Sequence, residues 1–199
     1  LLIAVILAIF LLPFSYTVSP YQLDPTKILQ APSLEHLFGT DRLGRDMLAR
    51  ILEGGQTSLI IGFLAASISS IVGLFIGINA GYFKGNIDKT ITIMIDLFLT
   101  FPTFFLLLAL VSYIQASALI LIIVISITSW MGMARMIRSE SFAIGNKPFI
   151  KILKVANVST FKIIFKYFAP LLAPIFLISF TFGVGGSILA ESGLSFLGL

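Results

Sequence analysis

Long apolar runs, separated by short polar stretches, occupy most of the chain after residue 55. The runs are apolar on every side of a helix rather than along one stripe, and each is near or above the roughly 20 residues needed to cross the hydrocarbon core of a bilayer. The pattern therefore predicts an all-α, polytopic membrane protein. The spans predicted after the first are 57–83, 90–114, 116–133 and 168–189.

A shorter apolar run over 1–12 ends at Pro13. We interpret it as the end of a truncated first span, because it is too short to cross a bilayer. A cleaved signal peptide is the alternative, but no basic region precedes the run and no small-residue cleavage site follows it. The chain is thus predicted to contain five visible spans, with a polar segment over 13–55 after the first.

The amino-acid composition agrees with the apolar pattern and excludes several classes of protein and of functional site. Hydrophobic residues make up 58% of the chain and charged residues 11%, about half the charge of a soluble domain. A soluble globular protein is therefore excluded. The chain has no cysteine, which excludes a disulfide framework, a thiol nucleophile and a cysteine metal site.

Charge is distributed unequally between the two sides of the predicted membrane protein. If the first span runs outward, the loops 84–89 and 134–167 share one side and 13–55 faces the other. The first side carries Asp88 and Glu140 against a basic set of Lys84, Lys89, Arg135, Arg138, Lys147, Lys151, Lys154, Lys162 and Lys166. Because basic loops stay in the cytoplasm, 134–167 is predicted to be cytoplasmic. The net charge of +4 then reflects orientation rather than nucleic-acid binding.

The outer segment contains one predicted amphipathic helix. It is expected to start near Thr40 or Asp41 and to stop at Gly54 and Gly55, lying along the outer membrane surface. Its apolar side would carry Leu43, Met47, Leu48, Ile51 and Leu52. Asp46 and Arg50 are four residues apart in the favourable order and are expected to form an ion pair.

Small residues in the second span predict tight helix packing. Gly73, Gly77 and Gly81 form two overlapping G-x-x-x-G steps and share one helical face. Another backbone is expected to approach closely there.

The third span contains a carboxylate and a proline. Asp96 lies about two turns in from Lys89, and an ionisable group at that depth faces protein or water rather than lipid. Pro102 is expected to bend the helix. Both residues are candidates for a pathway or a hinge. The alternative is a structural Asp96 that caps or pairs at the inner headgroup boundary, with Arg135 as one possible partner.

The loop 134–167 is predicted to contain two short amphipathic helices. Lys147, Lys151 and Lys154 share a face beside Ile150 and Leu153. A following apolar stripe consists of Phe161, Ile164, Phe165 and Phe168. A long loop with its own helices is typical of a docking site for a cytoplasmic partner. Basic helices resting on anionic headgroups are the alternative.

Three stretches resemble one family, the permease subunits of binding-protein-dependent ABC importers, in the dipeptide, oligopeptide and nickel branch. HLFGTDRLGRD at 36–46 is similar to the signature before the second span of that branch, and ESGLSFLG at 191–198 to the one after the fifth. KILKVANVS at 151–159, with IIFKYFAP at 163–170, resembles the family's cytoplasmic loop. The matching signature residues are Gly39, Thr40, Asp41, Gly44, Arg45, Asp46, Glu191, Ser192 and Ser195.

The cytoplasmic loop departs from the family pattern at three positions. The family's Glu falls on Lys151, its Gly on Asn157 and the Leu before its Pro on Ala169, while Ser159, Ile164 and Pro170 agree. Lys151 reverses a charge, so the partner surface is expected to differ there. Asn157 is a milder change, because Asn tolerates the left-handed conformation that Gly adopts.

The resemblance implies one type I transmembrane domain over 1–199, with a sixth span expected beyond Leu199 and the chain cut at both ends. It implies a second homologous permease, two cytoplasmic ATPases and an extracytoplasmic binding protein as partners, in a prokaryotic inner membrane. The loop would form a helix that couples the spans to an ATPase. The residues that this role falls on are Phe149, Ile150, Lys151, Leu153, Lys154, Val155, Asn157 and Ser159.

We therefore expect the pathway subunit of an ATP-driven peptide importer. Import of nickel or a metal–chelator complex is the alternative, and a secondary transporter or a membrane scaffold are rivals of other classes. The chain has no G-x-x-x-x-G-K-[ST], H-E-x-x-H or G-x-S-x-G motif, so no catalytic, cofactor or metal residue is assigned. The partner ATPases would bind ATP and Mg. The single His36 is interpreted as a structural loop residue.

Overall fold

A computed structural model describes residues 1–112 and 117–197, except for the side chains of Phe104, Val111 and Ser112. The described residues are helical apart from loops and one isolated bridge between Thr40 and Asp46. The helices are α1 (Leu2–Leu11), η1 (Leu12–Phe14), η2 (Pro25–Lys27), α2 (Met47–Phe83), α3 (Gly85–Leu99), α4 (Thr103–Ser112), α5 (Ala118–Gly145), α6 (Pro148–Val155), α7 (Thr160–Ile163), η3 (Ile164–Phe168) and α8 (Ala169–Phe196).

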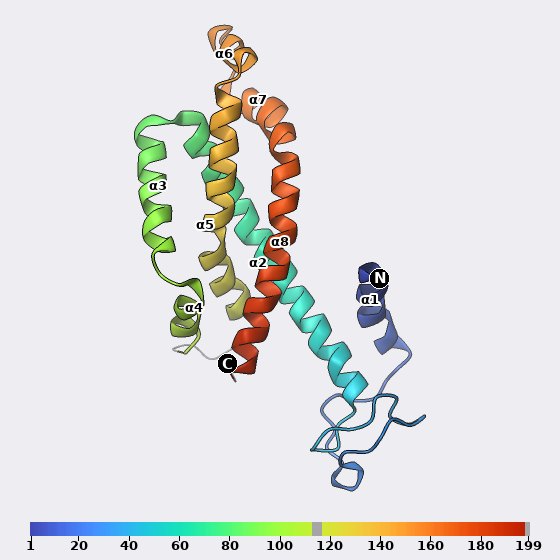
Figure 1. Cartoon of the computed structure of the whole chain (residues 1–199). Helices are drawn as coiled ribbons and strands as arrows, with labels where there is room; N and C mark the ends of the chain where they lie inside the picture. The colour runs from blue at the N-terminus through green and yellow to red at the C-terminus, as the bar shows by residue number, and fades with distance from the viewer. Residues whose placement is uncertain (113–116, 198–199) are drawn as a thin grey trace. The chain divides into compact units, whose positions relative to one another are not determined.

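The chain forms two compact units, Leu1–Ile60 and Ile61–Leu199, and α2 contributes to both. Unit 1 holds α1, the irregular segment after it and the beginning of α2. Unit 2 holds the remaining helices, and in Figure 1 its α5 lies between α3 and α8.

Three helical stretches in the described residues are long and apolar enough to cross a membrane: Met47–Phe83, Ala118–Gly145 and the continuous stretch Thr160–Phe196. A shorter apolar helix covers Leu2–Phe14. The long helices extend beyond the predicted spans, because an apolar run marks the hydrocarbon crossing and not the end of the hydrogen-bonded helix. Within the predicted cytoplasmic loop 134–167, α5 continues to Gly145, and a helix resumes at Thr160.

The predicted third span is broken rather than bent. Helix α3 ends at Leu99 and α4 begins at Thr103. Pro102 cannot donate a backbone hydrogen bond and disfavours helical geometry in the residue before it. The carbonyl of Phe98 accepts from the N–H groups of Thr100 and Phe101 where the helix ends. The end of this predicted span, 113–114, and residue 116 of the next lie outside the described residues.

The helix predicted from Thr40 to Gly54 was also wrong at both ends. Helix α2 begins at Met47 and passes through Gly54 and Gly55 without a break. Glycine weakens a helix by only about 1 kcal/mol relative to alanine, which the apolar span that follows outweighs. Residues 40–46 form a loop instead.

Helix α2 packs closely on α5 along its three regularly spaced glycines. A Cβ atom at Gly73 would lie 2.7 Å from Cβ of Met133, one at Gly77 would lie 2.7 Å from the carbonyl oxygen of Ala134, and one at Gly81 would lie 2.7 Å from that of Arg138. These distances leave no room for a side chain. The close backbone approach expected from the G-x-x-x-G steps is therefore present, and its partner is α5.

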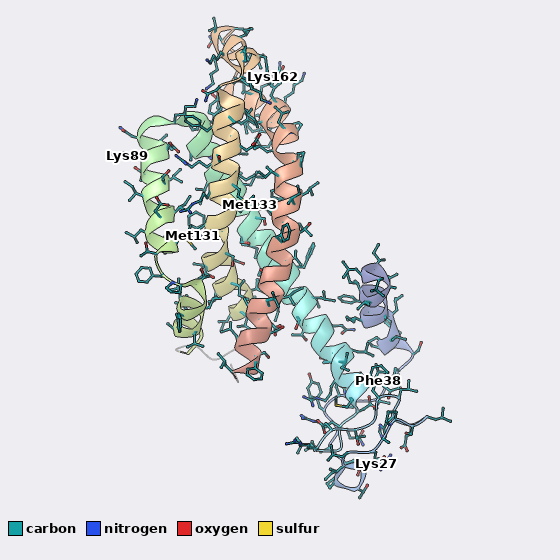
Figure 2. All side chains as sticks on the ribbon, in the orientation of Figure 1. Lys27, Phe38, Lys89, Met131, Met133 and Lys162 are labelled. Atoms are coloured by element: carbon teal, nitrogen blue, oxygen red, sulfur yellow. The ribbon has the colours of Figure 1, made fainter. Side chains whose placement is uncertain are left out.

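The core of unit 2 consists of separate apolar clusters around α5. In Figure 2, Met131 and Met133 both lie on α5. Met131 packs with Ile95 of α3, while Met133 belongs to a larger cluster with Phe168 and Leu172. A third cluster joins Ile125 of α5 to α2, α4 and α8. Each neighbouring helix thus contacts α5.

Substitution of Gly77 tests the packing of α2 on α5. Gly77→Ala should lower the stability of the folded protein by about 1–3 kcal/mol, because the methyl group overlaps the α5 backbone. Gly132→Ala is the matched control, since a Cβ at Gly132 meets nothing within 4 Å and gains the same helix propensity. Thermal unfolding of the two purified variants measures the difference. Equal stability of the two would contradict the packing account.

Candidate functional site

Helix α6 stands at the end of α5 and contains most of the predicted coupling residues (Figure 1). It begins at Pro148, and proline suits the first position of a helix because its fixed φ is helical and it needs no hydrogen-bond partner there. Lys147 precedes it in an extended conformation. The chain therefore turns sharply between α5 and α6.

The C-terminal end of α6 is closed by Asn157. Its φ is +57°, in the left-handed region. The N–H of Val158 donates to the carbonyl of Leu153 at 3.1 Å, and the N–H of Asn157 donates to that of Lys154 at 3.1 Å. This pair of bonds is a Schellman motif, in which glycine usually takes the position of Asn157. The glycine in the family pattern thus corresponds to a left-handed helix end, which Asn157 keeps.

One face of α6 is attached to unit 2. Ile150 is fully buried in the cluster that contains Ile144, Ile163 and Phe168. Leu153 and Val158 are partly buried against the same cluster. Phe149 adds a ring contact, 6.3 Å between centroids, with Tyr167. Ile150 therefore anchors α6 and is not available to a partner.

The opposite face of α6 is apolar and exposed. Ile152 is 66% exposed and Val155 is 88% exposed. Burying a side chain of this size is worth about 1.5–3 kcal/mol, so two such residues on one short helix form a surface suited to a protein contact. Val155 was among the predicted coupling residues. Ile152 was missed because the prediction rested on the basic face of the helix.

The lysines near α6 differ in their surroundings. Lys154 Nζ lies 4.1 Å above the ring of Tyr82, so its charge is directed back toward unit 2. Lys84 Nζ donates to Asn146 Oδ1 at 2.6 Å and lies 4.2 Å from the ring of Phe142. Lys147 and Lys151 are exposed. The predicted basic face of Lys147, Lys151 and Lys154 is therefore not uniform.

Basic residues gather at the end of unit 2 where α6 lies. Figure 2 shows Lys89 and Lys162 near this end. Lys84 at the end of α2 and the lysines from Lys147 to Lys166 belong to the same end. These basic residues thus lie together, as the unequal distribution of charge along the sequence predicts.

Two ion pairs connect α3 to α5. Asp96 accepts from Arg135 Nη2, and Asp88 accepts from Arg138 Nε and, at 2.9 Å, from Arg138 Nη2. The pairing of Asp96 with Arg135 is the one that the structural interpretation of Asp96 predicts. The side chains of Arg135 and Asp96 are still 54% and 58% exposed. A charged pair so exposed at membrane depth requires protein or water beside it.

A cavity of about 310 Å³ lies among α4, α5 and α8. Thr103 and Ser129 supply polar groups from α4 and α5, and small residues of α8 supply much of the remaining wall. These small residues are Gly183, Gly186, Ser187 and Ala190. They were not predicted as site residues, although their spacing of three to four along one helix is a signal that could have found them. Nearby Glu191 of the second signature is buried; Gly198 of that signature lies outside the described residues.

The first signature, 36–46, is a folded loop in unit 1. Gly39 and Gly44 both have a φ of +73°, which residues with a side chain rarely adopt. Thr40 accepts from the N–H of Gln30 at 2.9 Å and donates to the carbonyl of Lys27. The signature residues therefore fix the backbone of this loop.

Asp41 holds the turn of that loop together. Its carboxylate accepts from the N–H groups of Leu43 and Arg45 and from the side chains of Arg45 and Arg50. Burial raises the pKa of Asp41, but the backbone N–H groups of Arg45 and Leu43 and the side chain of Arg45 outweigh this effect and lower the pKa to about 2. Arg50 thus pairs with Asp41, at 2.6 Å, and not with Asp46 as the sequence predicted.

Asp46 is the buried centre of unit 1. It accepts from the N–H of Ala49 at 2.7 Å, which caps α2, from the hydroxyl of Tyr16 at 2.7 Å and from His36 Nδ1 at 2.9 Å. Burial raises the pKa of Asp46, but hydrogen bonds from the N–H of Ala49, the Tyr16 hydroxyl and His36 lower it by more. The pKa of Asp46 is therefore below its ordinary value. His36 is therefore a partner of a buried carboxylate. No group of three His, Cys, Asp or Glu side chains in the described residues could hold a metal ion.

Replacing Tyr16 tests the role of Asp46. Tyr16→Phe should destabilise unit 1 by about 1.5–3 kcal/mol, because a hydrogen bond to a buried charge is lost. Tyr21→Phe is the matched control, since Tyr21 makes an exposed bond to Glu53 at 3.2 Å. Hydrogen exchange of the amides of residues 39–46 should accelerate in the first variant only. Equal exchange in both would contradict the account.

The same bond predicts a pH dependence. Burial, followed by the Asp46 carboxylate, raises the pKa of Tyr16 from 10.0 to about 12. Its contribution to stability is therefore complete below pH 10 and lost as the pH rises toward 12. Glu53 also raises the pKa of Tyr21, so Tyr21→Phe is again the control. Spectrophotometric titration should show an ionisation near pH 12 that Tyr16→Phe removes and Tyr21→Phe keeps; the reverse result would contradict the assignment.

The sequence is similar to those of known transport system permeases. The chain is 37% identical over 190 residues to the oligopeptide transport system permease protein OppC of Mycobacterium tuberculosis (strain ATCC 25618 / H37Rv), covering 94% of this chain and 64% of that protein. It is 36% identical over 196 residues to the dipeptide transport system permease protein DppC of Alkalihalophilus pseudofirmus, covering 98% and 64%. It is 33% identical over 201 residues to OppC of Haemophilus influenzae, covering 100% and 63%.

The chain thus spans less than two thirds of the length of these curated relatives. Residues 73–199 match the family described as the binding-protein-dependent transport system inner membrane component. This match contains the glycine-packed part of α2, the exposed face of α6 and the signature at 191–198. The chain is a multi-pass protein of the cell membrane and belongs to the family of binding-protein-dependent transport system inner membrane components.

Proposed function

We propose that this chain is the pathway subunit of an ATP-driven importer of peptides. The observation that carries the proposal is the family match over 73–199 together with relatives that are named oligopeptide and dipeptide permeases. These names favour peptides over nickel or a metal–chelator complex. A family defined by dependence on a binding protein also argues against a secondary transporter.

In the proposed importer, α6 is the element that couples the spans to an ATPase. Its exposed face, formed by Ile152 and Val155, supports this role because it is apolar and faces away from the cluster that anchors Ile150. The partner ATPases would bind ATP and Mg, and this chain would perform no chemistry. By the positive-inside bias, the basic end with α6 faces the cytoplasm.

A second homologous permease would complete the pathway, and an extracytoplasmic binding protein would deliver the peptide. The half-exposed pair of Asp96 and Arg135 supports a second protein surface or a water-filled path beside α3. The break between α3 and α4 at Pro102 is the proposed place where the helices move. Alternating access then follows from movement of α6 with the ATPases.

Uptake into proteoliposomes tests the proposal. The purified complex should take up a labelled oligopeptide only when its binding protein is outside and ATP is inside with the ATPases. Labelled nickel and a nickel–chelator complex serve as competing cargo and should not be taken up. Peptide uptake by the permease without an ATPase, or nickel uptake in preference to peptide, would overturn the proposal.

Removing the apolar face of α6 should uncouple the ATPases. The double variant Ile152→Ser, Val155→Ser should fold normally, since both side chains are exposed. Its rate of peptide-stimulated ATP hydrolysis should fall at least tenfold. Ile178→Ser is the control, because Ile178 of α8 is similarly exposed, at 56%, but lies far along the chain from α6. Peptide-stimulated hydrolysis that survives the double variant would remove α6 from the coupling role.

A further inference from the structure

A groove of about 280 Å³ lies in unit 2 between α2 and the segment from α7 to α8. Phe75 and Ile78 of α2 form one wall, and Phe161, Ile164, Phe165 and Ala169 form the other. Its lining is predominantly apolar, and Phe75 and Phe161 are 65% and 71% exposed. Inside a membrane, an open apolar groove of this kind is filled by lipid or by another protein segment, because lipid tails are as apolar as the side chains that line it.

The π-helical turn η3 shapes this groove. Ile163 and Phe168 are five residues apart and are both fully buried, as a π-helical turn allows. Phe165 is then left on the other side, where its ring contacts that of Phe161 in a tilted arrangement, with centroids 4.3 Å apart. Insertions of this type are frequent at functional sites. Here the turn separates residues that fill the core from residues that line the groove.

Basic residues accompany the apolar wall. Lys162 and Lys166 alternate with Phe161 and Phe165 along the same short segment, and both lysines are exposed (Figure 2 labels Lys162). The sequence has no Asp or Glu between Glu140 and Glu191, and none in α2 after Glu53. Both walls of the groove therefore come from segments without acidic residues.

Depth along α2 shows which kind of ligand fits. Phe75 lies nine residues before Lys84, about 13 Å along the helix, so the groove extends from the basic end of the helices into the hydrocarbon region. A ligand there must offer an anionic group at one end and an apolar chain at the other. Basic pockets between helices at the cytoplasmic side of a membrane recognise anionic lipid headgroups.

We propose that this groove binds one anionic phospholipid, with an acyl chain against Phe75, Ile164 and Phe165 and the headgroup phosphate at Lys162 and Lys166. The site is independent of the cargo and of the ATPases. It would fix the start of α8 relative to α2 in membranes that contain anionic lipid.

Native mass spectrometry of the purified full-length protein tests the proposal, with phosphatidylglycerol, phosphatidylcholine of the same acyl chains, and inorganic phosphate as probes. The unmodified protein should retain phosphatidylglycerol at least fivefold better than phosphatidylcholine. Lys162→Gln, Lys166→Gln should bring this ratio close to one. Lys147→Gln, Lys151→Gln is the matched control, because these lysines are also exposed but lie on or next to α6, outside the segment that carries Phe161 and Phe165. It should keep the full preference.

The acyl-chain contact is tested separately. Ala169→Phe fills the groove and Phe165→Ser removes part of its wall, so each should reduce retention of both lipids; the second variant covers the case in which the first fails to fold. An unchanged lipid ratio in the Lys162 and Lys166 variant would overturn the proposal. Displacement of phosphatidylglycerol by equimolar inorganic phosphate would show a free-anion site instead. Loss of ATPase co-purification with unchanged lipid retention in Phe165→Ser would show a protein contact instead. None of these outcomes depends on the transport assay.

Discussion

The approach of α2 to α5 along Gly73, Gly77 and Gly81 is the contact on which unit 2 depends. Inside a bilayer, apolar side chains gain nothing from the hydrophobic effect when helices associate, so packing of backbones and small residues must hold them together. The three glycines allow this approach over two helical turns. They also bring Tyr82 to the end of α5, where it packs with Phe168, ring centroids 5.4 Å apart, in the cluster that anchors α6.

The anchoring of α6 is what would let this short helix transmit movement in the proposed coupling role. Ile150 is enclosed by residues from α5, α7 and η3, and the Schellman motif at Asn157 holds the opposite end of the helix. A force on Ile152 or Val155 would therefore reach α5 and α8 through packed side chains rather than through a flexible loop. The same rigidity makes the left-handed conformation at Asn157 a requirement, which explains why the family pattern has glycine there.

Features that depend on neighbouring residues could be predicted from the sequence, whereas features that depend on distant ones could not. Apolar runs predicted the long helices, and the glycine spacing predicted a close helix contact. The loop 40–46 was mistaken for a helix because its structure depends on Asp46 meeting Tyr16, thirty residues earlier. For the same reason, the spacing of four residues wrongly predicted an ion pair between Asp46 and Arg50, whereas Arg50 pairs with Asp41. At α6, the spacing of the lysines predicted a basic face. It gave no sign that Lys154 lies over the ring of Tyr82 or that Ile152 and Val155 are exposed.

Site-directed cross-linking tests most directly whether α6 links this membrane subunit to an ATPase, as we propose. The chain has no cysteine, so Val155→Cys introduces a single thiol into it. In the assembled complex, a reagent with one thiol-reactive end and one photoreactive end should join this position to an ATPase subunit, with a yield that changes when ATP is added. The same substitution at Ile178 should give no such product. An assembled complex that hydrolyses ATP and imports peptide, yet gives no cross-link from Val155, would contradict the account.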